Sequence, residues 1–117
     1  MSNTDGTITS QVRANPTAGV SIIGWTGTGV GASVGHGLNK VPGMVIVKTR
    51  DGTVANGNPN PTWLVWHTGL GTQYTYLNSS NTLLTASSTT RGGLGVPTST
   101  TVTLTSGSTD AYTPNRS

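Results

Sequence analysis

The sequence contains no cysteine, no phenylalanine and no glutamate, and charged residues make up only 8% of its 117 residues. The lack of cysteine excludes disulfides and the commonest zinc sites. Six Lys and Arg residues outnumber three Asp residues, which gives a formal net charge of +3, but the cations are scattered along the chain. Nucleic-acid-binding proteins instead carry clustered cations with interleaved aromatics. We therefore expect no nucleic-acid partner.

Long apolar runs are also absent. No run approaches the roughly 18 residues that cross a membrane, and the N-terminus lacks the basic and apolar regions of a signal peptide. We expect a protein that is made in the cytoplasm and has no membrane partner.

The residues that dominate instead are Thr (23), Gly (17), Ser (12) and Asn (9), which together exceed half of the chain. Such a composition is compatible with disorder, but the apolar residues come in short clustered runs, which indicates a folded chain of one domain. No segment shows apolar residues at helical spacing, whereas Thr, Val and aromatic residues favour strands.

Seven runs are predicted as strands. The run 43–50 is the most apolar and is predicted as a central strand buried on both faces; in the run 98–106, Val102 and Leu104 are predicted to point inward. Short strands separated by turn signals indicate an all-β fold, an antiparallel β-sandwich (jelly-roll or lectin-like) of about six to eight strands. The seven predicted strands are 20–26, 32–34, 43–50, 62–67, 73–78, 82–87 and 98–106.

The expected division of the chain has three parts. Residues 1–17 are predicted as an extended N-terminal arm, residues 18–107 as the β-sandwich domain and residues 108–117 as a C-terminal tail. In the arm and the tail, the side chains predicted to contact a partner are Ile8, Val12, Arg13, Tyr112 and Arg116.

The stretch SVGHGLNKVPGMVIVKTR (33–50) raises the question of catalysis, because His36 stands between two glycines. A catalytic histidine needs a group that orients it or receives its proton, and the only carboxylates fall in the predicted arm, a turn and the tail. A tight turn that feeds a strand is the structural alternative, and we favour it for His36. His36 and His67 together lack a third metal ligand, and no serine sits in a Gly-x-Ser-x-Gly elbow. We therefore expect no catalytic residue, no metal and no cofactor.

Tryptophans raise the question of glycan binding. Trp63 and Trp66 fall on opposite faces of one strand, so at most one faces solvent when the other is in the core. Core filling is the favoured role, because each buried tryptophan removes on the order of 200 Å² from water. A glycan site would use the loop 56–63, with Asn58, Asn60 and Trp63.

Five motifs carry a family resemblance: GVSIIGWTGTG (19–29), VGHGLNKVPGMVIVKTR (34–50), WLVWHTGLG (63–71), YLNSSN (76–81) and VPTSTTVTLTS (96–106). In this order and spacing they resemble the lectin-like, concanavalin-type β-sandwich modules of marine bacteriophage structural proteins, which include tail-fibre and other virion components. The resemblance covers roughly residues 15 to 107. Those modules close with an aromatic-rich strand, whereas this chain ends in DAYTPNRS. Either one strand is missing, or the arm fills the gap, or a neighbouring molecule supplies the strand.

The resemblance implies a viral protein of the virion. We expect a capsid decoration protein that is made in the host cytoplasm and binds the head exterior through its arms and edge strands. Its partners would be the major capsid protein and copies of itself, as a homo-oligomer. The alternative is a tail-fibre or receptor-binding tip module that binds a host surface glycan. A decoration protein of this design would lose particle binding without residues 1–17, while the sandwich would still fold.

Overall fold

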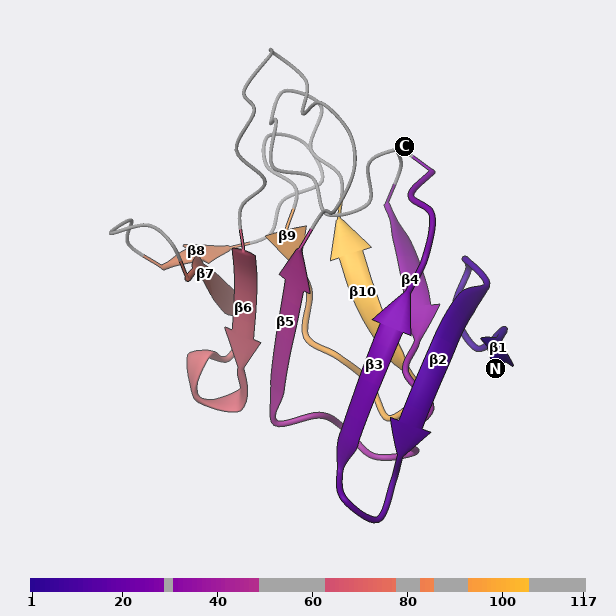
Figure 1. Ribbon diagram of the computed structural model, residues 1–117. Coiled ribbons are helices and arrows are strands. Elements are labelled where there is room, and N and C mark those ends of the chain that lie inside the picture. The colour runs from indigo at the N-terminus through magenta and orange to yellow at the C-terminus, as the bar shows by residue number, and fades with distance from the viewer. Residues whose placement is uncertain (29–30, 49–62, 78–82, 86–92, 106–117) are drawn as a thin grey trace.

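The computed structural model describes residues 1–28, 31–48, 63–77, 83–85 and 93–105. These residues form ten strands and a short 3-10 helix, and none of them lies in an α-helix. Every strand pairs with its neighbours in the antiparallel sense. The predicted all-β, sandwich-like fold is therefore confirmed (Figure 1).

The first sheet has the order β1-β2-β3, with β1 at Ser2–Asn3, β2 at Ser10–Asn15 and β3 at Val20–Gly24. A turn joins β2 to β3, and in it the Asn15 side-chain oxygen accepts a hydrogen bond of 3.0 Å from the Ala18 N–H. Asn and Pro are common turn formers, because their side chains favour such local bends. This hairpin sets the register in which the polar outer face of β2 lies beside the apolar outer face of β3.

The predicted arm is therefore wrong, since residues 1–17 supply two strands of this chain's own sheet. Val12 is 7% exposed and Ser10 is fully buried. The Ile8 N–H donates to the Ser33 carbonyl at 3.0 Å, and Ile8 packs against the core. The alternation of apolar and polar residues in this segment buries its inner face against the domain itself, not against a partner.

The second sheet has the order β4-β10-β9, with β4 at Ala32–Gly35, β10 at Thr101–Thr105 and β9 at Gly93–Leu94. Val102 and Leu104 of β10 are 2% and 0% exposed, which confirms their predicted inward direction. Leu94 of β9 is buried as well, in a segment that none of the seven predicted strands includes.

The third sheet has the order β5-β6-β7-β8. Its strands are β5 (Met44–Lys48), β6 (Trp63–His67), β7 (Gln73–Tyr76) and β8 (Leu84–Thr85), and the 3-10 helix η2 (Thr68–Leu70) joins β6 to β7. Tyr74 and Tyr76 point to one face, and their rings meet edge to face with centroids 5.9 Å apart.

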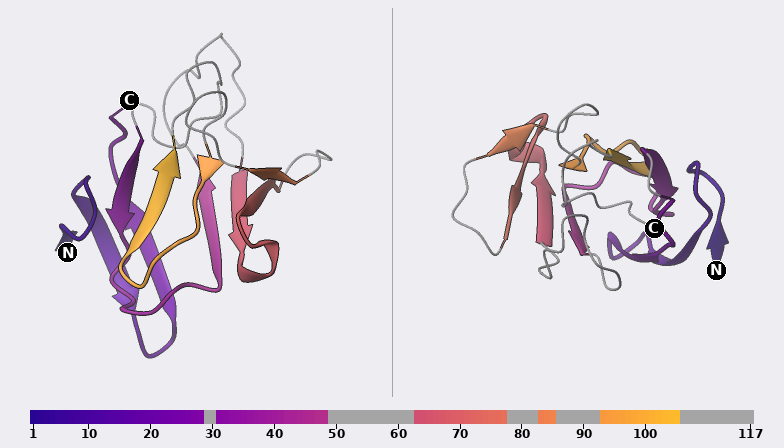
Figure 2. Two further views of the ribbon diagram at one scale, coloured as in Figure 1. Left: turned by 180° about the vertical axis from the view of Figure 1, so that it is seen from behind. Right: turned by 90° about the horizontal axis from the view of Figure 1, so that it is seen from above.

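The three sheets are arranged as two layers around one core (Figures 1 and 2). The sheets that contain β3 and β5 face the viewer of Figure 1, and β4 and β10 lie behind them. Core side chains come from both layers, since buried residues of the strands β4, β5, β6, β7, β9 and β10 form one cluster. Its members are Val34, Val47, Leu64, Trp66, Tyr74, Tyr76, Leu94, Val102 and Leu104.

All seven predicted strands occur, β4 extends one residue beyond its predicted end, and β1, β2 and β9 bring the total among the described residues to ten. The prediction that the run 43–50 is central and buried on both faces is wrong. β5 pairs with β6 alone among the described strands, and its Met44 and Ile46 side chains are 55% and 51% exposed. The predicted tail, residues 108–117, lies outside the described residues.

Candidate functional site

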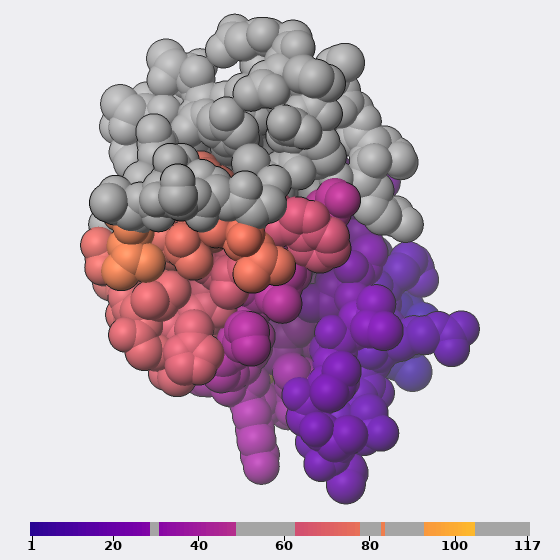
Figure 3. All heavy atoms as spheres, turned by 60° about the vertical axis from the view of Figure 1, so that its left-hand side comes forward, coloured from indigo at the N-terminus to yellow at the C-terminus, as the bar shows by residue number. Residues whose placement is uncertain are grey.

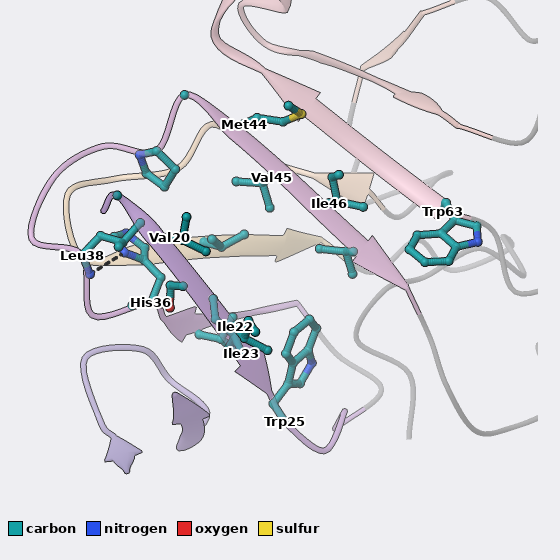
Figure 4. A pocket seen from close by; sticks show the side chains of 17 residues that line it. Val20, Ile22, Ile23, Trp25, His36, Leu38, Met44, Val45, Ile46 and Trp63 are labelled. Atoms are coloured by element: carbon teal, nitrogen blue, oxygen red, sulfur yellow. Dashed lines mark hydrogen bonds between the residues drawn. The ribbon is translucent and has the colours of Figure 1, made fainter. Parts of the chain in front are cut away.

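An apolar groove separates β3 from β5 on the front of the molecule (Figure 4). Its volume is about 630 Å³, which is within the range of about 300–1,000 Å³ found for ligand sites. β3 lines one side and β5 lines the other, while β10 passes between them in Figure 4. Val34 of β4 and Val102 of β10 form the base of the groove.

The groove is apolar because both flanking strands carry apolar side chains on both of their faces. The inner residues, Ile23 of β3 and Val45 of β5, pack against the core. The outer residues do not: Ile22 is 71% exposed, and Ile46 on the other side is 51% exposed. Scattered exposed apolar residues are normal, but a contiguous apolar patch marks an interaction surface. We call this set the outer stripe; it comprises Val20, Ile22, Met44 and Ile46.

Both strands beside the groove are edge strands within the part of the chain that the structure describes. β3 pairs only with β2, and β5 pairs only with β6. An edge strand presents a row of backbone N–H and C=O groups that another strand can pair with. The groove therefore combines an apolar surface with two backbone edges.

The charges near the groove are positive. Arg13 is exposed and lies directly opposite Ile22 in the β2–β3 pair. Lys48 ends β5, and its ammonium lies 4.6 Å from the centre of the Trp63 ring. Asp5 is the one carboxylate among the described side chains, and it accepts a hydrogen bond from Asn3. A ligand that approaches this face meets apolar surface with cations on either side.

Two tryptophans, Trp25 and Trp63, line the groove (Figure 4), and Trp63 is the one predicted for a glycan site. It begins β6 and is 38% exposed, whereas Trp66 of the same strand is 2% exposed. The prediction that these two tryptophans lie on opposite faces is confirmed. In Figure 3 the N-terminal strands (indigo to purple) and the β6–β7 region (pink) lie on opposite sides of the magenta atoms of β5.

The predicted partner contacts have different outcomes. Ile8 and Val12 belong to the domain's own packing, so neither is available as an arm contact. Arg13 remains on the surface beside the outer stripe. Tyr112 and Arg116 lie outside the described residues, as do Asn58 and Asn60 of the predicted glycan loop.

His36 is a buried structural residue at the end of β4, 1% exposed. Its Nδ1 accepts a hydrogen bond of 3.1 Å from the Leu38 N–H (Figure 4). Because Nδ1 is the acceptor, Nε2 carries the proton and donates to the Thr98 carbonyl at 3.1 Å. Gly37 follows with φ of +70°, a left-handed conformation that glycine adopts at no steric cost. The expected turn is confirmed, and both ring nitrogens are engaged in holding it.

His67 ends β6 and is exposed. Its Nδ1 accepts a hydrogen bond of 3.0 Å from the Gly69 N–H, which caps the 3-10 helix. Across residues 1–28, 31–48, 63–77, 83–85 and 93–105, no group of three or more His, Cys, Asp or Glu residues is placed to hold a metal ion. A search of the same residues finds no helix with the length and apolar character needed to cross a bilayer.

The outer stripe was not predicted from the sequence. The signal was available in MVIVK (44–48), where a run that is apolar at every position ends in a lysine. Such a run predicts a central strand, but an edge strand with an exposed apolar face gives the same pattern. VSII (20–23) has the same property, since its two faces are both largely apolar.

A domain family described as "Domain of unknown function (DUF7483)" matches residues 1–116. No curated protein and no solved structure matches the chain. The match covers nearly all of the chain, so it includes every strand that borders the groove.

Proposed function

The chain belongs to this DUF7483 family, whose description states no function, and we propose that it is a bacteriophage virion structural protein that decorates the capsid exterior. Such a protein binds the head in many identical copies and stabilises it through repeated contacts. Its partners are the major capsid protein and neighbouring copies of itself.

One observation carries this proposal: the apolar groove lies between two edge strands and is bordered by the exposed outer stripe. Stable protein–protein interfaces need an apolar centre with a polar rim. The outer stripe provides such a centre, and Arg13 with the Lys48–Trp63 pair provides the rim. The resemblance of the motifs to phage structural modules suggests that the partner is a protein of a phage particle.

The copy number of the chain in purified virions tests the proposal. Quantitative mass spectrometry of particles of the phage that encodes the chain is expected to give a number of copies comparable with that of the major capsid protein. A handful of copies, in multiples of three or six, would instead assign the chain to the tail. Complete absence from purified particles would contradict a virion role.

The exposure of Trp63 supports a second candidate, a tail-fibre tip that binds a host surface glycan. Aromatic rings combine an apolar face with defined geometry, which suits stacking on a sugar. For this function we expect Trp63→Ala to weaken binding of the purified chain to host cells by about tenfold or more, because central aromatic residues dominate binding energy. Flow cytometry with the labelled chain measures this, with Thr72→Ala at an exposed turn as the control. Equal binding by both variants would argue against the glycan role.

A further inference from the structure

The two strands beside the groove run in the same direction. In Figure 1 the arrows of β3 and β5 point to the same end of the molecule, with the groove between them. An extended chain that entered in the opposite direction would be antiparallel to both strands at once. It would join the first sheet to the third sheet and close the front layer over β4 and β10.

The dimensions of the groove suit a short strand. β3 and β5 have five residues each, and five residues of strand span about 17 Å. The most deeply buried apolar residues that line the groove are Val34, Val47 and Val102. Inward side chains of an entering strand would therefore have to be apolar. Outward side chains would lie between Ile22 and Ile46, which are largely exposed, so apolar residues are favoured there as well.

We propose that an extended segment of the capsid protein binds in this groove as an added β-strand between β3 and β5. The inference rests on the proposed function, because it names the contact that attaches the decoration protein to the head. Strand addition uses main-chain hydrogen bonds for affinity and side-chain pockets for specificity. Here the hydrogen bonds would form on both sides of the entering segment, because each flanking strand has one unpaired edge among the described strands.

The charges select a partner other than a second copy of the chain. Arg13 lies beside Ile22, and Lys48 lies at the end of β5. A second copy has a net charge of +3 and would bring the same cations, whereas opposite charges across an interface favour association. Every described strand of a second copy, moreover, already pairs with at least one neighbour in its own sheet, so none has both edges available for β3 and β5 at once. The entering segment is therefore expected to be apolar in its centre, with carboxylates toward its ends.

Site-specific cross-linking identifies the segment. Because the chain has no cysteine, Ile22→Cys and Ile46→Cys each provide one attachment point for a benzophenone maleimide. Heads that lack the chain are mixed with each labelled variant and irradiated, and the linked peptides are identified by mass spectrometry. Both positions are expected to link to the same short segment of the capsid protein, whereas Gln11→Cys on β2 is expected not to link to it. Links from the two positions to different segments, or to another copy of this chain, would overturn the proposal.

A binding measurement then separates this inference from the proposed function. Ile22→Lys combined with Ile46→Lys adds two charges at exposed positions, so the domain is expected to keep its thermal unfolding midpoint. Its affinity for the heads is expected to fall about 100-fold, as for loss of central interface residues. A control with Gln11→Lys and Thr72→Lys adds the same charge away from the groove and is expected to bind within about threefold of the parent chain.

The outcomes are distinguishable. If the parent chain coats the heads and the groove variant binds equally well, strand addition is wrong and the decoration role stands. If the parent chain itself does not bind heads, the decoration role is wrong, and the capsid segment is excluded as the occupant of the groove. If the groove variant loses binding while the parent chain and the control bind, and the cross-links reach one segment, both the decoration role and strand addition are supported.

Discussion

Deletion of residues 1–17 is expected to unfold the domain. The deletion removes β1 and β2, and with them the partner of β3 along its whole length. It also removes buried Ser10, whose hydroxyl donates to the Gly35 carbonyl at 3.0 Å, and buried Val12. The total stability of a domain is about 5–15 kcal/mol. The loss of a five-residue ladder with its buried side chains is a large part of that.

Circular dichroism and calorimetry measure this effect. The truncated chain is expected to show no cooperative thermal transition at temperatures where the full chain is folded. The control keeps the backbone and changes only exposed side chains of the same segment: Gln11→Ala with Arg13→Ala is expected to shift the unfolding free energy by less than about 1 kcal/mol. A truncated chain that melts cooperatively near the midpoint of the full chain would show that the segment is an arm after all.

This result matters for reading particle-binding experiments. From the sequence alone, the truncated chain is expected to fold but not to bind particles. From the structure, it is expected neither to fold nor to bind. Loss of binding after truncation would therefore say nothing about where the partner docks. The exposed outer stripe, whose side chains contribute little to the core, provides the informative substitutions.

Alternation within one strand was predictable from the sequence, because neighbouring side chains of a strand point to opposite faces. Val102 and Leu104 were placed correctly on this basis, and so was the pair Trp63 and Trp66. His36 was also assigned correctly to a turn, because its flanking glycines permit the tight turn that its two ring nitrogens hold. These predictions depend on residues that are close in sequence.

Strand order was not predictable, because it depends on pairings between distant segments. Nothing in residues 1–17 reveals that Ile8 lies beside Val34 or that Gly6 approaches the Ser33 carbonyl so closely that a side chain has no room there. The exposed position of Met44 and Ile46 likewise depends on tertiary structure, because only the opposite face of β5, with Val47, is packed against the core. The groove exists because the strand order places β3 and β5 on either side of it. The sequence therefore showed that these two segments are apolar, but it did not show that they border a groove.

Replacement of His36 by alanine is expected to lower the free energy of unfolding by about 3–5 kcal/mol, the range for loss of a large buried side chain together with buried polar partners. The ring joins two segments: Nδ1 binds the Leu38 N–H in the turn before β5, and Nε2 binds the Thr98 carbonyl before β10. Alanine leaves a cavity and removes the hydrogen-bond partner of both the Leu38 N–H and the Thr98 carbonyl. The turn between β4 and β5 would no longer be held to the segment before β10. The end of the groove that His36 and Leu38 line would then be less ordered.

The second histidine of the chain provides the matched control. His67→Ala removes one exposed cap of a 3-10 helix, and a lost cap costs about 1 kcal/mol. Urea denaturation compares the two variants, and ¹⁵N NMR of the parent chain is expected to show His36 as the neutral tautomer with the proton on Nε2. If His36→Ala were no less stable than His67→Ala, the ring would not be needed to hold the turn. His36 would then have to be reconsidered as a residue kept for chemistry, because a buried imidazole that contributes nothing to folding needs another reason to be there.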